Sequence, residues 1–331
     1  MGTLSWLEAI VIGGLQGVAE LFPVSSLGHS VLIPAVIGGS WAQDLDVSSP
    51  ESPYLAFVVG LHVATALALV VYFWRDWARI IRGLVTSIVR REVTEPDQRL
   101  GWLLVVSTIP VALAGLVLEH VFRVYLSRPQ PTAAFLVVNG VLLLVGERLR
   151  QRSEARDPDP ATVPLVQDPA TVPLTRVHAA DLGHGGAPRR TPAPATAEEL
   201  ADRRLAELPL GRAVLIGAAQ IAALAPGISR SGSAMVAGLV KGLSHADAAR
   251  FSFLLATPVI LAAGLLKVGD LAGPLGDGIR PQILVGSLLS GVGAYVSVRY
   301  LTRYFETRSL RPFGIYCIVA GLACLAWFWL R

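Results

Sequence analysis

The chain has 331 residues, of which 53% are apolar and only 16% are charged, and its mean hydropathy is +0.56. Soluble domains carry about 25% charged residues, so this composition excludes an ordinary soluble domain and indicates an integral membrane protein. The net charge of +4 comes with no fold or aromatic platform that binds nucleic acid, and we expect no nucleic-acid partner.

The N-terminal region, about residues 4–40, contains an apolar run, a Pro/Ser/Gly break and a second apolar run. We interpret this pattern as a re-entrant hairpin, because irregular backbone is tolerated at membrane depth where it is buried in protein or lines a wet cavity. A pair of full but irregular spans fits the same pattern. The break carries the polar residues Ser25, Ser26 and His29.

Three full spans are predicted next, at about 53–74, 100–118 and 132–146, and they complete a first membrane repeat over residues 1–147. The first two segments approach the roughly 20 apolar residues that cross a hydrocarbon core. The third is shorter and is a plausible span only inside a bundle, where the bilayer adapts to it.

Two arginine-rich loops set the predicted orientation, since the positive-inside rule places such loops in the cytoplasm. They lie after the first full span and before the last, and their arginines are Arg75, Arg79, Arg82, Arg90, Arg91 and Arg99 in one loop and Arg299, Arg303, Arg308 and Arg311 in the other.

This topology puts residues 148–209 in the cytoplasm. The segment is rich in Pro, Arg, Asp and Glu and contains DPATVPL twice, at 159–165 and 168–174. It has no periodic apolar face with which to offset the entropy of ordering, so we expect a disordered linker.

The second membrane repeat, residues 210–331, is predicted to follow the plan of the first. A hairpin at about 210–240 precedes three spans, at 251–266, 282–298 and 312–330. Counting back from the cytoplasmic loop 299–311 makes this hairpin start and finish inside, whereas the first starts and finishes outside.

The two hairpins also resemble each other in sequence. Gln16 precedes Ser25 by nine residues, Gln220 precedes Ser229 by nine, and a proline lies between the members of each pair. Opposite entry of two similar broken hairpins is the inverted-repeat plan. The predicted fold is therefore an all-α polytopic membrane protein with an inverted-topology repeat, two re-entrant hairpins and about six full transmembrane helices.

The polar residues of the two breaks form a candidate site. Gln16 and Glu20 are four residues apart and share a helix face. The second break supplies Arg230, whose guanidinium suits phosphate oxygens. Helices that begin after the breaks present free N–H groups, and serine hydroxyls add further donors. These features predict an oxyanion site whose other members are Ser25, Ser26, Gly28, His29, Gly227, Ser229, Ser231 and Gly232.

Structural roles compete with this interpretation. Glu20 and Arg230 could form a buried ion pair that joins the repeats, and Ser25 and Ser26 could be helix caps. His62, alone in a charge-free span, is interpreted as a packing histidine. Gly13 and Gly17 allow close helix packing, either within the bundle or in a homodimer.

Four stretches carry a resemblance to a known family. LQGVAELFPVSSLGHS and APGISRSGSAM resemble the two signature motifs of the undecaprenyl-diphosphate phosphatase, or bacitracin-resistance, family. LHVATALALVVYFWRDW and DAARFSFLLATPVILAAG are similar to its other recurrent stretches, and the resemblance covers the chain apart from about 150–208.

The resemblance implies hydrolysis of undecaprenyl diphosphate to undecaprenyl phosphate and inorganic phosphate, which recycles the lipid carrier of cell-wall synthesis. It also implies a divalent cation, Mg²⁺ or Ca²⁺, and a bacterial plasma-membrane site that opens to the outer face. The other expected partners are membrane lipids.

Position by position, the resemblance places Gln16 and Glu20 in the family's acidic motif, and the serines, glycines, His29 and Arg230 in its two turns. Ala234 departs from the threonine that many relatives have. In the expected phosphoryl transfer, Glu20 with Gln16 holds the cation or a water, and Arg230 binds oxygens. His29 acts as general base or nucleophile, with Ser26 as its partner or as the nucleophile itself. A polyprenyl-phosphate flippase or transporter is the alternative function, because inverted repeats are typical of alternating access.

Overall fold

The computed structural model describes residues 4–46, 53–156, 196–266 and 278–330. All regular secondary structure within these ranges is helical. The first half comprises α1 (Trp6–Ala19), α2 (Ser26–Ile37), α3 (Ser40–Asp44), α4 (Pro53–Tyr72), α5 (Trp74–Arg90), α6 (Pro96–Val121), a short π-helix η1 (Phe122–Leu126) and α7 (Pro129–Arg156). The second comprises α8 (Ala197–Ala206), α9 (Leu210–Ala219), the 3₁₀ segment η3 (Gln220–Leu224), α10 (Arg230–Val240), α11 (His245–Leu266), α13 (Arg280–Thr307) and α14 (Arg311–Trp329).

Six of the described helices are long and apolar enough to cross a membrane: α4, α6, α7, α11, α13 and α14. This confirms the predicted polytopic helical fold. Several of these helices run beyond the apolar segments that predicted them. α13, for example, continues through Arg299 and Arg303, because long arginine side chains can extend along a helix toward water without ending it.

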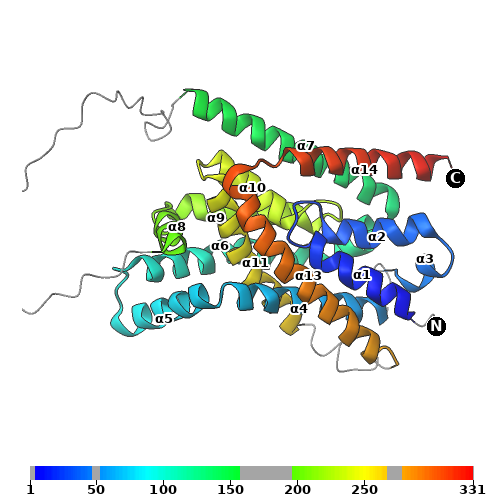
Figure 1. Cartoon of the computed structure of the whole chain (residues 1–331), viewed down its shortest axis with the longest axis horizontal. Helices are drawn as coiled ribbons and strands as arrows, with labels where there is room; N and C mark the ends of the chain where they lie inside the picture. Colours follow the sequence, from blue (N-terminus) through cyan, green and yellow to red (C-terminus); the bar gives the residue numbers. More distant parts are fainter. Residues whose placement is uncertain (1–3, 47–52, 157–195, 267–277, 331) are drawn as a thin grey trace, which may run out of the picture.

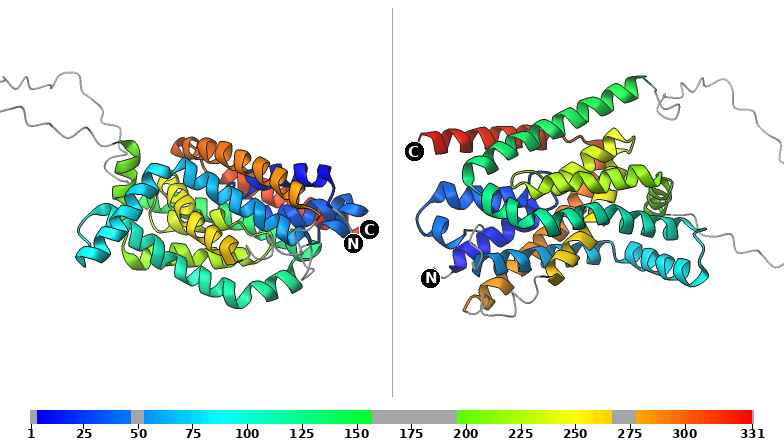
Figure 2. Two further views of the ribbon diagram at one scale, coloured as in Figure 1. Left: turned by 90° about the horizontal axis from the view of Figure 1, so that it is seen from below. Right: turned by 180° about the vertical axis from the view of Figure 1, so that it is seen from behind.

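The long helices run roughly along one direction, with α7 and α14 packed together at one edge of the molecule and α4 and α5 toward the opposite edge (Figures 1 and 2). The two short hairpins, α1–α2 and α9–η3–α10, lie between these edges (Figure 1). Both contact α7 through their second helix, α2 or α10, so this long helix joins the two halves around the breaks.

Helix α1 packs closely against α13. A Cβ added at Gly13 would lie 2.6 Å from the carbonyl oxygen of Gly286, closer than carbon and oxygen can approach. Gly17 lies in the same way against the backbone of Ser290. The two glycines therefore serve packing within the bundle, and the predicted homodimer gains no support from them.

Residues 74–90, predicted as part of a cytoplasmic loop, form helix α5. One face of the helix, which carries Asp76, Ile80, Gly83 and Ser87, is buried, while its remaining surface mixes arginine with exposed apolar side chains. The arginines obscured the helical repeat of the buried face, and this explains why the sequence prediction missed the helix.

The predicted linker 148–209 is helical at both of its described ends. Helix α7 continues to Arg156, and α8 begins at a capping box formed by Thr196 and Glu199. Asp202 of α8 bonds to Arg250 of α11 at 2.7 Å. This ion pair and the burial of Leu205, Ala206 and Leu208 in the apolar core order the C-terminal end of the segment. Residues 157–195 lie outside the described residues.

Candidate active site

The first hairpin places a carboxylate and a hydroxyl together. Gln16 and Glu20 are one helical turn apart at the end of α1, and the amide nitrogen of Gln16 donates to Glu20 Oε2 at 3.0 Å. The chain turns at Pro23 and re-enters a helix at Ser26, whose hydroxyl donates to the same carboxylate oxygen. The predicted grouping of these three residues is therefore present in the fold.

Both second helices of the hairpins begin with the same serine cap. Ser25 caps α2 by accepting from the Gly28 N–H at 3.2 Å, and Ser229 caps α10 by accepting from the Gly232 N–H at 3.1 Å. Ser25 has a φ of 67°, a strained value for a non-glycine residue. The two serines thus serve as helix caps, one of the roles open from the sequence, and they also line the cavity described below.

The second hairpin contributes the positive charge. Arg230 is the first residue of α10, and its Nη2 lies 2.5 Å from Glu20 Oε1. Its Nη1 donates to the Ala256 carbonyl of α11 at 3.2 Å. A guanidinium carries five N–H donors, so these two contacts fix its plane and leave further donors for a ligand.

The two turns touch each other where the hairpins meet. A Cβ added at Gly28 would lie 2.9 Å from the Gly227 Cα, and Gly227 itself has a φ of +107°. Asn139 of α7 bridges the turns, since its amide nitrogen donates to the Pro23 carbonyl at 3.0 Å and its side-chain oxygen accepts from the Ser229 N–H at 2.9 Å. The sequence prediction did not include Asn139, although a lone amide in a charge-free span was a signal for it.

A cavity of about 120 Å³ opens at this junction. At about 30 Å³ of liquid volume per water, it is large enough for a few water molecules or a compact anion. It is lined by the N-termini of α2 and α10, whose N–H groups favour negative charge. The lining residues are Glu20, Ser25, Ser26, Leu27, His62, Ala223, Ile228, Ser229 and Arg230.

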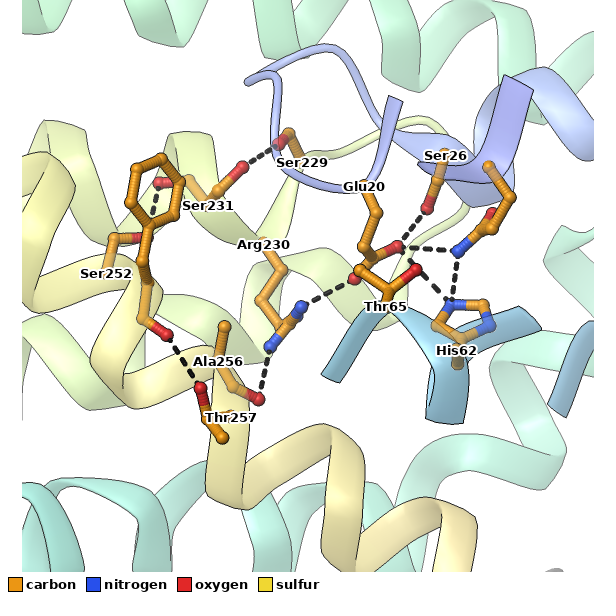
Figure 3. Close-up of polar contacts among 12 residues, drawn as sticks. Glu20, Ser26, His62, Thr65, Ser229, Arg230, Ser231, Ser252, Ala256 and Thr257 are labelled. Atoms are coloured by element: carbon orange, nitrogen blue, oxygen red, sulfur yellow. Dashed lines mark hydrogen bonds and ion pairs between the residues drawn. The ribbon is translucent and has the colours of Figure 1, made fainter. Parts of the chain in front are cut away.

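His62 belongs to this site, which corrects its interpretation as a packing histidine. Its Nε2 lies 3.1 Å from the Gln16 amide nitrogen and 3.4 Å from Glu20 Oε2. Figure 3 shows His62 and Ser26 approaching the Glu20 carboxylate from one side while Arg230 approaches it from the other. A lone ionisable residue inside an apolar span indicates a functional role, and His62 is such a residue.

His29 faces away from the cavity, contrary to its predicted catalytic position. Its Nδ1 lies 2.7 Å from the Ser25 carbonyl and its Nε2 lies 2.7 Å from the Tyr316 hydroxyl of α14. The two rings also stack, with centroids 5.8 Å apart. Because both ring nitrogens are bonded to Ser25 and Tyr316, His29 stabilises the strained Ser25 turn and is not placed to attack a ligand in the cavity.

The remaining predicted residues support the turns. Ser231 bonds to the Ser229 hydroxyl at 3.1 Å and does not line the cavity, and the Gly232 N–H serves the helix cap. Ser233, next to the divergent Ala234, bonds back to the Ser229 carbonyl at 2.9 Å. The residues that converge on the cavity are therefore fewer than the sequence motifs suggest.

The donor set does not fit a divalent cation held by the protein alone. Both oxygens of Glu20 already accept hydrogen bonds, one of them from a guanidinium, and the Gln16 amide nitrogen, not its oxygen, faces the carboxylate. Among the residues described, no three His, Cys, Asp or Glu side chains gather closely enough to hold a metal ion. The predicted Gln16–Glu20 cation site is thus not formed by this arrangement, and no step below relies on a cation.

Comparisons with known proteins agree across the whole chain. The family model described as bacitracin resistance protein BacA matches residues 9–173 and 187–323. An undecaprenyl-diphosphatase of Mycolicibacterium paratuberculosis is 59% identical over 99% of both chains. Undecaprenyl-diphosphatase 1 of Frankia casuarinae is 54% identical over 99% of both chains, and the undecaprenyl-diphosphatase of Granulibacter bethesdensis is 38% identical over 98% of this chain and 97% of its own.

Proposed function

The chain belongs to the bacitracin resistance protein BacA family, and from this membership and its site we propose that it is an undecaprenyl-diphosphatase. It hydrolyses undecaprenyl diphosphate to undecaprenyl phosphate and inorganic phosphate, which recycles the lipid carrier of cell-wall synthesis and gives resistance to bacitracin. The observation that carries the proposal is the meeting of Glu20, Ser26 and Arg230 at one cavity between two helix N-termini.

The cavity suits the terminal phosphoryl group of a lipid diphosphate. Phosphoryl transfer depends mainly on positioning and on stabilising the charge of the transferred group. Arg230 supplies a planar set of donors, and the α2 and α10 N-termini supply N–H groups that need no reorganisation during the reaction. These groups would hold the phosphoryl oxygens with the lipid phosphate directed out of the cavity.

Ser26 is the residue that we propose attacks the terminal phosphorus. Ser26 lines the cavity, and its hydroxyl donates to Glu20 Oε2. As the Oγ–P bond forms, the proton passes to Glu20, the bond from phosphorus to the bridging oxygen breaks, and undecaprenyl phosphate leaves. Water then attacks the phosphoserine phosphorus and the P–Oγ bond breaks. Glu20 returns its proton to Ser26 Oγ, and inorganic phosphate leaves with both hydrogens of the water. His29, the other candidate nucleophile, lies behind the turn.

The protein is a multi-pass membrane protein, and its finer placement is part of the proposal. The arginine-rich segments 75–99 and 299–311 support a cytoplasmic location for residues 148–209 by the positive-inside rule. The resemblance of the motifs supports a site that opens to the outer face of a bacterial plasma membrane. Exposed apolar side chains on the six long helices would contact membrane lipids.

Two measurements on the purified chain in detergent test this function. Phosphate release from undecaprenyl diphosphate is expected without any membrane, whereas a flippase would release none. Rapid acid quenching with ³²P in the terminal position should trap an acid-stable phosphoserine, which peptide mapping assigns to Ser26. A parallel quench in alkaline detergent preserves phosphohistidine. Such a label at His29, or turnover with no label above that of a Ser26→Ala variant, would overturn the assignment.

A further inference from the structure

We infer that His62 is a positioning residue of this site, which holds Glu20 in its reactive orientation through the side chain of Gln16. The inference rests on the proposed hydrolysis and adds a residue of α4, a helix outside both hairpins, to its machinery. It stands on hydrogen-bond geometry, which can be followed outward from the α4 backbone to the carboxylate.

The ring of His62 is fixed by its own helix. Its Nδ1 lies 2.8 Å from the Val58 carbonyl oxygen, one turn earlier in α4. A carbonyl oxygen only accepts, so Nδ1 must carry a hydrogen and donate it. In the neutral ring, Nε2 is then an acceptor, and it is this nitrogen that faces Gln16 and Glu20.

The Gln16 amide nitrogen joins the histidine to the carboxylate. It lies 3.1 Å from His62 Nε2 and 3.0 Å from Glu20 Oε2, so each of its two hydrogens has one acceptor. A carboxamide flipped by half a turn would place its oxygen against both acceptors and lose both bonds. With its ring neutral, His62 therefore selects the orientation of Gln16 in which the amide donates to Glu20.

That orientation matters because Glu20 must serve two partners at once. Oε1 faces Arg230 while Oε2 accepts from Ser26, and the bond from Gln16 to Oε2 holds the carboxylate plane between them. The Glu20 side chain is only 6% exposed, whereas that of His62, which also lines the cavity, is 29% exposed. Solvent therefore has little access to replace a lost bond at Glu20, and a loosened carboxylate would misdirect the Ser26 proton.

A second histidine offers a matched control. His245 at the start of α11 also bonds a buried carboxylate, that of Glu147, with Nε2 to Oε2 at 2.8 Å. None of the cavity-lining residues belongs to this pair. Replacing His245 by leucine removes a comparable buried contact and leaves the cavity residues unchanged.

The experiment measures kcat and KM for phosphate release from undecaprenyl diphosphate in detergent, together with thermal unfolding of each variant. His62→Leu should lower kcat about 10- to 100-fold, the scale of a misplaced reacting group, with KM within about threefold. His62→Gln, which keeps an acceptor for the Gln16 amide, should recover most of the lost kcat. His245→Leu should lower the melting temperature but leave kcat of the folded protein within about twofold.

A double variant adds a readout that a loss of folding would not produce. If Gln16 and His62 act as one unit, Gln16→Leu/His62→Leu should be no slower than the slower single variant. Multiplied effects, or an unchanged kcat in His62→Leu beside an active wild type, would overturn the role of His62 alone. A wild type that releases no phosphate would instead overturn the proposed function, and the inference with it.

Discussion

Variants of the ion pair between Glu20 and Arg230 can separate its contribution to folding stability from its contribution to catalysis. Arg230→Met keeps the volume of the side-chain stem and removes the guanidinium, which leaves the buried Glu20 side chain, 6% exposed, without its counter-charge. Breaking a buried ion pair costs about 3–5 kcal/mol. Because Gln16 and Ser26 still donate to this carboxylate, we expect the lower end of that range, about 3 kcal/mol of unfolding free energy.

In free-energy terms, Arg230→Met should lose more in transition-state stabilisation than in the free energy of unfolding. An arginine that stabilises the charge of a transferred phosphoryl group contributes about 10³–10⁵-fold in kcat, so Arg230→Met should release phosphate at a rate near background. The double variant Glu20→Gln/Arg230→Met removes the unpaired charge. It should regain most of the lost stability and none of the activity.

The assays are phosphate release from undecaprenyl diphosphate in detergent and thermal or denaturant unfolding of the same preparations. Arg230→Lys is the matched control for charge, since it keeps the positive charge and loses the planar set of donors. It should unfold near the wild type and remain slow. Near wild-type turnover in Arg230→Met, or a double variant no more stable than the single one, would refute this account of the pair.

Three further predictions follow from the geometry of the turns and of the donor set. Tyr316→Phe removes the hydroxyl that bonds His29 Nε2 but keeps the stacked ring, so kcat for phosphate release should fall less than about tenfold. A much larger loss of kcat in the same assay would instead indicate a direct catalytic role for a His29 activated by Tyr316. Asn139→Leu breaks both hydrogen bonds that join the turns and leaves the Ser229 N–H and the Pro23 carbonyl unpaired. Denaturant unfolding should show a loss of about 2–4 kcal/mol in the free energy of unfolding. A change below about 0.5 kcal/mol would contradict the bridging role of Asn139. Calorimetry of the protein without lipid diphosphate should find no tight Mg²⁺ or Ca²⁺ site, so stoichiometric submicromolar binding would contradict the interpretation of the donor set.

The sequence predicted the parts of the fold that depend on local chemistry. Proline marks each break, and of the two serines that could cap the helix of the first hairpin the structure shows Ser25 in that role, with Ser229 in the same role in the second hairpin. The ion pair of Glu20 with Arg230 is present as well, which the sequence offered as the structural alternative to a binding role for the two charges.

The roles of the histidines depended on information that the local sequence does not carry. His29 lies three residues after Ser26, and only the packing of α2 against α7 and α14 decides which way that face turns. His62 lies far from both motifs, and its place beside Glu20 follows from how α4 packs against α1. Helix α8 carried a readable signal in its Thr196–Glu199 capping box, which the polar composition around it outweighed.

The central claim is that the junction of the two hairpins hydrolyses a lipid diphosphate with Glu20 as its proton acceptor. The most direct measurement is inorganic phosphate released from undecaprenyl diphosphate by the purified wild type and by Glu20→Gln, which keeps the side-chain shape and removes the charge. We predict one phosphate per lipid from the wild type and a rate lower by at least about 10²-fold in the variant. Equal rates in the two proteins, or no phosphate from the wild type, would contradict the claim.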